Sequence, residues 1–212
     1  MKQLQSWLRG LSQSSRQPPA FGNIRCRIGF EHPLERKGFG PTNFMNSAPT
    51  IECHGLDTPE RVCFYEQDFY VLSNFSAFNV LIWGLRFQTA EHAYHWKKFA
   101  GYNDDVARWI FYAHSAHHAF KVAQAHKGTR QPDWDSIKVD VMREILREKV
   151  TQHDYVERKL AATGSRELVE NSWRDDFWGW GPNRDGQNML GKLWMEVREW
   201  VKNQPPIWVN EG

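Results

Sequence analysis

The chain of 212 residues has few cysteines and no long hydrophobic run. Its three cysteines are Cys26, Cys53 and Cys63, and no two of them form a CxxC pair. An odd number without paired spacing argues against a disulfide framework and favours a reducing compartment, so we expect a cytoplasmic location. No apolar run approaches the roughly 20 residues that span a bilayer, so no membrane segment is predicted.

The chain also lacks a strong charge of either sign. Its 27 lysines and arginines nearly balance 25 aspartates and glutamates, which leaves a formal net charge of +2. This balance gives no strong indication of a nucleic-acid or membrane partner, although a local patch could still bind nucleic acid. With 41% hydrophobic and 25% charged residues, the composition is typical of a globular domain with its own core.

The first sixty residues differ in composition from the rest. Residues 1–30 contain five basic residues and no acidic one, and residues 12–19 are rich in Ser, Gln and Pro. A loose basic arm accounts for this pattern, and an organelle transit peptide shares its basic bias. We therefore expect an irregular N-terminal extension over residues 1–60, one folded domain over residues 61–203 and a tail over residues 204–212.

Tryptophan is in excess, with eleven residues, most of them from Trp83 onward. An indole buries a large area and offers a flat stacking face, so the excess suits either a core or a site for flat ligands. The densest mixture is residues 72–99, where Asn74, Glu91 and Lys98 stand among Phe and Trp. Because burying an unpaired polar group costs roughly 1–3 kcal/mol, this mixture predicts a lined cleft.

A helix is predicted over residues 89–99, with Thr89 as its N-cap and Gly101 as its C-terminal breaker. An acid in the first turn is stabilised by the helix dipole, and an acid and a lysine on one face are also typical of a surface ion pair. Spacing alone therefore leaves a structural and a catalytic interpretation open. Spacings of three and four residues define two adjacent faces, Glu91, Tyr94 and Lys98 on one and His92, His95 and Phe99 on the other.

Residues 175–188 form a second stretch, rich in Gly and Trp. Its spacing matches neither a GxGxxG fingerprint nor an EF-hand. Its glycines allow close approach of the backbone, and Arg184, Gln187 and Asn188 supply hydrogen-bond donors. Because the loop leads into a helix predicted over residues 189–202, it is either an anion site at a helix N-terminus or a plain connecting loop.

The remaining elements are predicted to be mainly helical. A strand over residues 62–65 could pair with residues 69–72, and Trp83-Gly84 is predicted to form a turn after the apolar run of residues 80–82. A core helix begins at Asp133, its expected N-cap, and carries the stripe Ile137, Val141 and Ile145. Other helices are expected over residues 106–112 and 154–163, the second ending at Gly164, and residues 168–170 form a short element of undecided type.

A group of histidines, His114, His117 and His118, is the best metal candidate by composition. Histidines three and four residues apart can share a helix face and bind zinc. No cysteine stands nearby and no HExxH order is present. A polar helix face is the competing interpretation. A zinc-dependent hydrolase would follow only if these histidines bind a metal.

Several separate blocks, spread over roughly residues 62–201, resemble the NADAR family, also called YbiA-like. The family usually has Gln where this chain has His95, and a Gly-Arg pair near residues 125–128, where this chain reads Ala-His-Lys-Gly. The matching blocks are Phe64-Tyr65, residues 72–75, Gly84, residues 89–94, Lys98-Phe99, Asp133-Trp134, Lys138, Val141-Met142, Thr163-Gly164, residues 168–170, Asp176, Trp178-Gly179, Gly181 and a last block from Gly186 to Arg198.

The resemblance implies an α+β fold that is predominantly helical, in one compact domain with a few short strands. It implies an N-glycosidase that acts on riboflavin-pathway ribosyl phosphates or on ADP-ribosylated guanine in nucleic acid, with no cofactor, no metal, no membrane and no obligate protein partner. It implies Lys98, which precedes Phe99, as a nucleophile that forms a Schiff base, and Glu91 as the acid/base group. The implied substrate-binding residues are Asn74, Phe75, Trp83, His92, Trp134, Asp176, Trp178, Gly179 and Asn188.

Two alternatives stay open. The same pocket could belong to a non-catalytic module that binds ADP-ribose or a nucleotide. The reactive amine could also be Lys97 in place of Lys98. The positive charge of either lysine would lower the pKa of its neighbour.

Overall fold

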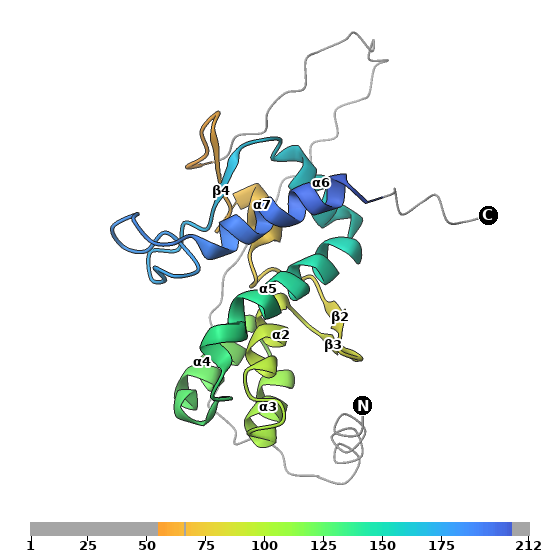
Figure 1. Ribbon diagram of the computed structural model, residues 1–212, viewed down its shortest axis with the longest axis vertical. Coiled ribbons are helices and arrows are strands. Elements are labelled where there is room, and N and C mark those ends of the chain that lie inside the picture. Colours follow the sequence, from red (N-terminus) through yellow and green to blue (C-terminus); the bar gives the residue numbers. More distant parts are fainter. Residues whose placement is uncertain (1–54, 66, 205–212) are drawn as a thin grey trace, which may run out of the picture. The chain divides into compact units, whose positions relative to one another are not determined.

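The computed structural model describes residues 55–65 and 67–204 (Figure 1). Most of the expected N-terminal extension and tail lie outside these residues. The described elements are, in chain order, β1 (Arg61–Cys63), η1 (Gln67–Leu72), β2 (Val80–Ile82), β3 (Leu85–Phe87), α2 (Ala90–Lys97), α3 (Asp104–Phe111), α4 (Ala116–Ala125), η2 (Lys127–Thr129), α5 (Trp134–Thr151), α6 (Asp154–Ala162), β4 (Glu167–Val169) and α7 (Met189–Lys202).

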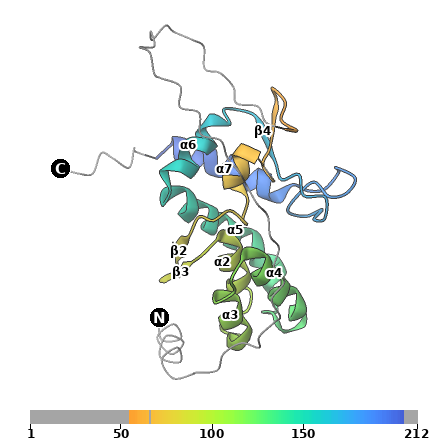
Figure 2. The same cartoon turned by 180° about the vertical axis from the view of Figure 1, so that it is seen from behind.

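Helix α5 is the element on which the others are assembled. It lies between α2 and α7 in both views (Figures 1 and 2), and it also contacts α6 and β2. Of its predicted apolar stripe, Val141 and Ile145 are buried and expose 6% or less of their surface, whereas Ile137 is half-buried. Burying side chains of this size contributes about 1.5–3 kcal/mol each. Helix α5 therefore fixes the position of α2, which carries the groups of interest.

The described strands form two separate pairs. Strand β1 runs parallel to β4, and β2 and β3 form an antiparallel hairpin. The hairpin turns at Trp83 and Gly84, which have φ values of +53° and +76°. Positive φ at both central positions is the geometry of a tight hairpin turn, so the turn predicted there is confirmed. The predicted pairing of residues 62–65 with residues 69–72 is wrong, because η1 is helical and β4 supplies the partner strand.

Several helix boundaries follow the caps expected from the sequence. The His92 backbone N–H donates to Thr89 Oγ1 at 3.3 Å, so Thr89 caps α2 as predicted. Gly101, with a φ of +82°, ends the turns after α2. Asp133 precedes α5 but its side chain makes no capping bond; instead Ser136 Oγ donates to the Asp133 carbonyl at 2.7 Å.

A buried lysine on α5 holds the loop between η1 and β2. Lys149 is fully buried, and its Nζ donates to the Ser73 carbonyl at 2.9 Å and to Ser76 Oγ at 2.8 Å. Burial lowers the pKa of Lys149 to about 7. From α7, Trp194 Nε1 donates to the Leu72 carbonyl at 2.7 Å. The loop is therefore fixed from two helices at once.

The described elements confirm the predicted α+β class with helices predominating and a few short strands. Within residues 55–65 and 67–204, none of the helices combines the length and the apolarity that crossing a membrane requires.

Candidate active site

Helix α2 brings Glu91 and His95 together one turn apart. Glu91 exposes 7% of its surface and His95 4%, and Glu91 Oε1 lies 2.8 Å from His95 Nε2. Side chains four residues apart on a helix can share a face, so Glu91 pairs with His95, which was predicted to lie on the adjacent face. The Glu91 backbone N–H donates to the Asn74 carbonyl at 3.1 Å. The carboxylate is therefore held both through its side chain and through its backbone.

The two adjacent lysines at the end of α2 extend to different aromatic rings. Lys98 Nζ lies 6.0 Å from the ring centre of Trp134, whereas Lys97 Nζ lies 4.9 Å from that of Trp83. Lys98 is buried and Lys97 is half-buried. Of the two lysines, only Lys98 therefore lies beside Trp134, which also contacts Tyr94.

The Lys98 amine has a lowered pKa. Burial is the largest cause, and the positive charges of Arg130 and Lys127 act in the same direction, so the pKa falls to about 8. The negative charges of Asp135 and Glu91 oppose this shift. With a pKa of about 8, roughly a tenth of the amine is neutral at pH 7. Glu91 and Lys98 therefore lie within electrostatic reach of each other, and the lysine can act as a nucleophile.

Three aromatic side chains form a cluster beside this pair. Tyr94 meets Trp134 at a ring-centre distance of 4.9 Å and Trp178 at 5.5 Å, both edge to face. Burial raises the pKa of the Tyr94 phenol above its ordinary value, so it stays protonated. Trp178 is only half-buried and comes from the loop before α7. The cluster joins α2, α5 and that loop around the end of α2.

Two further acids belong to this region and are not predicted from the sequence as site residues. Asp175 Oδ1 accepts the backbone N–H groups of Phe177 at 2.9 Å and Trp178 at 2.7 Å, and so fixes the loop at Trp178. Glu170 Oε2 is buried and has no hydrogen-bond partner among the described residues. Burial, followed by the charges of Glu91 and Asp175, raises the pKa of Glu170 to about 8. Glu170 is therefore mostly protonated at neutral pH and can donate a proton.

Asn74 presents a buried amide beside the start of α2. Its Nδ2 lies 3.4 Å from Met142 Sδ, and its Oδ1 is buried with no hydrogen-bond partner in the described part of the chain. Leaving such an atom unpaired costs about 1–3 kcal/mol, so it is a candidate acceptor for a ligand group. Phe75, the next residue, is half-buried. The structure thus brings together Asn74 and Glu91, two of the predicted site residues.

Trp83 and His92 are engaged in contacts within the protein. Trp83 Nε1 donates to Glu144 Oε1 at 3.0 Å on α5. His92 is fully buried, with Nδ1 2.8 Å from Thr89 Oγ1 and Nε2 3.0 Å from the Ala113 carbonyl. Both ring nitrogens of His92 and the indole N–H of Trp83 are therefore already paired, as in structural side chains. Substrate binding by these two residues stays a prediction without support from their contacts.

The loop residues predicted to bind substrate instead shape the surroundings of Glu170. Asn188, with a φ of +51°, donates from Nδ2 to the Leu168 carbonyl at 2.9 Å and accepts the Glu170 N–H at Oδ1 at 3.0 Å. A Cβ at Gly179 would lie 2.8 Å from the Glu170 carbonyl, so only glycine fits there. Asp176 is exposed. Asn188 therefore holds the backbone of Leu168 with its Nδ2 and that of Glu170 with its Oδ1.

The start of α7 does not offer the open anion site considered for residues 175–188. The first two N–H groups of the helix, those of Met189 and Leu190, donate to the carbonyls of Phe177 and Trp178, each at 3.0 Å. An anion at a helix N-terminus needs such groups to be free. The loop folds back over the helix start, so this interpretation is wrong for these donors.

A model of the NADAR domain family matches residues 63–202. The chain belongs to the NADAR domain family. It is 38% identical over 146 residues to an N-glycosidase of Nostoc punctiforme, which covers 67% of this chain and 93% of that protein. It is 34% identical over 134 residues to N-glycosidase YbiA of Escherichia coli, which covers 62% of this chain and 81% of that protein.

Another relative and a solved structure are also similar to this NADAR domain. The chain is 36% identical over 151 residues to a riboflavin biosynthesis protein of Vibrio vulnificus, matching 69% of this chain but only 40% of that protein. The NMR structure of E. coli YbiA superimposes with a TM-score of 0.62 at 31% identity, over 69% of this chain and 88% of that one. The fold expected from the family resemblance is therefore confirmed.

The histidines outside α2 do not assemble a metal site in the described part of this NADAR domain. The rings of His114 and His118 lie 4.4 Å apart, and His117 instead lies against Phe120. Among residues 55–65 and 67–204, no group of three or more His, Cys, Asp or Glu side chains is placed to hold a metal ion. The zinc hydrolase alternative therefore has no support from these residues.

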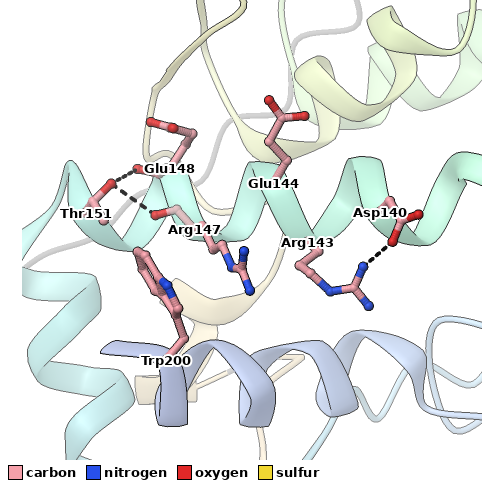
Figure 3. Close-up of a pocket in the computed structure, with 7 residues that line it drawn as sticks. All are labelled: Asp140, Arg143, Glu144, Arg147, Glu148, Thr151 and Trp200. Atoms are coloured by element: carbon pink, nitrogen blue, oxygen red, sulfur yellow. Dashed lines mark hydrogen bonds and ion pairs between the residues drawn. The ribbon is translucent and has the colours of Figure 1, made fainter. Parts of the chain in front are cut away.

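A hollow lies between α5 and α7 (Figure 3) and has a volume of about 370 Å³. In Figure 3, Arg143 and Arg147 extend from α5 toward α7, where they contact Glu196 at 2.7 and 3.4 Å. Arg147 also lies over Trp200, 5.2 Å from the ring centre. The charged side chains around this hollow are largely paired. Neither Glu91 nor Lys98 lines it. The lining residues are Asp140, Arg143, Glu144, Arg147, Glu148, Thr151 and Trp200.

Proposed function

We propose that this NADAR domain is an N-glycosidase that hydrolyses the bond between a base and a ribose. The observation that carries the proposal is Lys98, a buried amine with a pKa of about 8 beside Trp134 and within electrostatic reach of Glu91. Relatives named N-glycosidases, 34–38% identical to this chain, support the same activity. Matched groups of this kind are typical of catalytic sites.

The first half of the proposed reaction replaces the base by the lysine. Neutral Lys98 attacks the anomeric carbon of the ribose, and the bond from this carbon to the base nitrogen breaks with its electron pair going to the base. The base takes a proton, for which protonated Glu170 is the proposed source. The Glu91 carboxylate accepts a proton from the attached amine and stabilises positive charge that develops on the sugar.

The second half releases the sugar. The ring oxygen leaves the anomeric carbon and takes the proton held by Glu91, which leaves a Schiff base between the opened ribose and Lys98. Water then adds to this carbon and releases a proton that restores the acid form of Glu170, and the ribose departs as the free sugar with the lysine regenerated. In the net reaction, one water molecule is consumed for each base and each free ribose released.

The proposed substrates share a ribose joined to a flat base through nitrogen. A ribosyl phosphate intermediate of the riboflavin pathway and an ADP-ribosylated guanine both have this linkage. The half-buried indole of Trp178 and the unpaired Oδ1 of Asn74 supply a stacking face and an acceptor for the base. No protein partner is needed for this chemistry.

Borohydride trapping tests the proposal directly. Incubation with ADP-ribosylated guanosine DNA and with a pyrimidine ribosyl phosphate, with borohydride added, should reduce the Schiff base to a stable adduct on the peptide carrying Lys98. Lys98→Ala should abolish both adduct and turnover, whereas the matched control Lys97→Ala should retain both because Lys97 extends toward Trp83. Turnover that persists in Lys98→Ala would remove the covalent step. Binding without turnover would identify a non-catalytic module.

A further inference from the structure

A basic cleft adjoins the end of α2 and has not been assigned a role above. It has a volume of about 570 Å³, within the usual range of small-molecule sites, roughly 300–1,000 Å³. It is formed by η2 and the segment that leads into α5. The lining residues are Lys127, Gly128, Arg130, Gln131 and Pro132.

The wall of the cleft is bonded to the backbone that carries the reactive lysine. The Gln131 N–H donates to the Lys98 carbonyl at 3.1 Å, and Gln131 Nε2 donates to the Lys97 carbonyl at 3.0 Å. Gln131 is itself buried. The Trp134 N–H in turn donates to the Gln131 carbonyl at 3.3 Å. The cleft and the Lys98 side chain, which lies by Trp134, are therefore parts of one rigid corner.

Positive charge predominates around the cleft. Lys127 is exposed and makes no ion pair with any described residue. Arg130 pairs with Asp135, and the same carboxylate also lies 3.5 Å from Lys138 Nζ, so one acid is shared by two cations. The other nearby acid, Asp133, is exposed and does not line the cleft. The cleft therefore keeps a net positive charge that no described group neutralises.

We propose that this cleft binds the phosphate group of a phosphorylated ribosyl substrate, with Lys127 and Arg130 as the residues that select for it. The assignment rests on the proposed glycosidase function, because it names the part of the substrate that this corner recognises. Arginine offers a planar fork of donors that matches a phosphate, and lysine adds a compact positive charge. A phosphate held there leaves its ribose next to the backbone that carries Lys98.

The loop before α7 is the other place where a phosphate might have been expected. The first N–H groups of α7 are already bonded to loop carbonyls, as described above. The loop's arginine, Arg184, lies over Trp180 at 5.6 Å from the ring centre, on which Arg61 also lies at 4.9 Å. This arginine is therefore packed at the β1 side of the loop. Unlike Arg184, which lies over Trp180, Lys127 contacts neither an aromatic ring nor an acid among the described residues.

A binding experiment on the full chain tests the cleft without relying on turnover. The probes are methyl ribofuranoside 5-phosphate and methyl ribofuranoside, whose blocked anomeric carbon keeps them from reacting with Lys98. Calorimetry should show clearly tighter binding of the phosphorylated probe. Lys127→Ala and Arg130→Gln should each weaken that binding about tenfold, the loss expected for one charge-assisted contact. The control Lys121→Ala, an exposed lysine of α4 outside the cleft, should bind as the wild type does.

Equal binding of the two probes by the wild type would overturn the proposal, as would full binding by the Lys127→Ala, Arg130→Gln double variant. Thermal melting of each variant separates loss of a contact from loss of folding. In turnover assays, the ratio of kcat/KM for a phosphorylated riboside to that for its dephosphorylated form should fall about tenfold in either variant. If the phosphorylated probe binds through these cations but no riboside is hydrolysed, the phosphate site stands and the glycosidase function fails.

Discussion

Glu91 and His95 form a buried hydrogen-bonded pair in which the histidine uses only one of its ring nitrogens. Glu91 Oε1 lies 2.8 Å from His95 Nε2, while His95 Nδ1 is buried without a partner among the described residues. An ionised carboxylate only accepts hydrogen bonds, so Nε2 is the nitrogen that carries the hydrogen. His95 therefore acts as a single donor that orients the carboxylate. The side-chain amide of glutamine can do the same.

We predict that His95→Gln keeps most of the activity and that His95→Ala loses it by roughly tenfold or more in kcat/KM. A hydrogen bond to a charged group contributes about 1.5–3 kcal/mol, which corresponds to this loss. Steady-state kinetics on the substrate that traps on Lys98 provide the measurement, with thermal melting to verify that both variants fold. Equal activity of the two variants would show that orientation of Glu91 by residue 95 does not matter.

The reaction rate should rise toward about pH 8 as Lys98 loses its proton, and fall above it as Glu170 loses the proton that it donates to the base. Only the neutral Lys98 amine attacks, and its pKa of about 8 places the midpoint of the rise near that value. Arg130 and Lys127 lower this pKa through their charges. The double variant Lys127→Ala, Arg130→Gln should therefore move the midpoint to higher pH. A pH profile of kcat/KM for wild type and variant decides this, and an unchanged midpoint would contradict the electrostatic coupling.

Lys149 should give the fold a pH-dependent stability. Burial lowers its folded pKa to about 7 from an ordinary 10.5, so between these values the unfolded chain binds more protons than the folded one. Stability from this group therefore increases as pH rises from about 7 to 10.5, by several kcal/mol at about 1.4 kcal/mol per pKa unit. Urea unfolding at about pH 7 and 9.5 measures the slope.

The matched comparison for Lys149 is between Lys149→Met and Lys121→Met. The first should show a clearly smaller rise in stability with pH, because one of the two buried amines with a lowered pKa is gone while Lys98 remains. The second should keep the full rise, because Lys121 is exposed. If all three proteins share one slope, Lys149 is not the group responsible.

Gly191→Ala should destabilise the domain, because a Cβ at this position would lie 2.0 Å from the Leu168 carbonyl. Relieving such a clash requires α7 to move from β4, at a cost of about 1–3 kcal/mol. Activity should fall as well, since Glu170 directly follows β4. Gly128→Ala, where a Cβ meets nothing within 4 Å, is the control for stability in urea unfolding. Equal stability of the two variants would contradict the close packing.

Local signals in the sequence predicted the elements that depend on local physics. Thr89 caps α2, and the turn at Trp83 and Gly84 closes the hairpin, because a cap or a tight turn involves only a few neighbouring residues. The partner of β1 could not be found in this way. Strand β4 begins at Glu167, more than a hundred residues later, and no local pattern links the two strands.

The candidate site was predictable where one helix carries it and not where distant segments meet. Glu91 and Lys98 come from α2 and its end, so one stretch was enough to name both, and their roles stay predictions. The raised pKa of Glu170 depends on burial and on charges from other segments, which the sequence does not reveal. Conversely, His92 and Asn188 look like ligand groups in the sequence, yet their polar atoms bond to other parts of the protein.

The contact between Lys98 and Trp134 has a consequence for how the protein is made. Lys98 is synthesised before Trp134, and before Lys127 and Arg130, whose charges help to lower its pKa. Until these residues are in place the amine is bathed in water and stays fully charged, since burial is the main cause of its altered acidity. Reactivity toward cellular aldehydes and sugars is therefore withheld from the growing polypeptide and arises only once α5 has packed against α2.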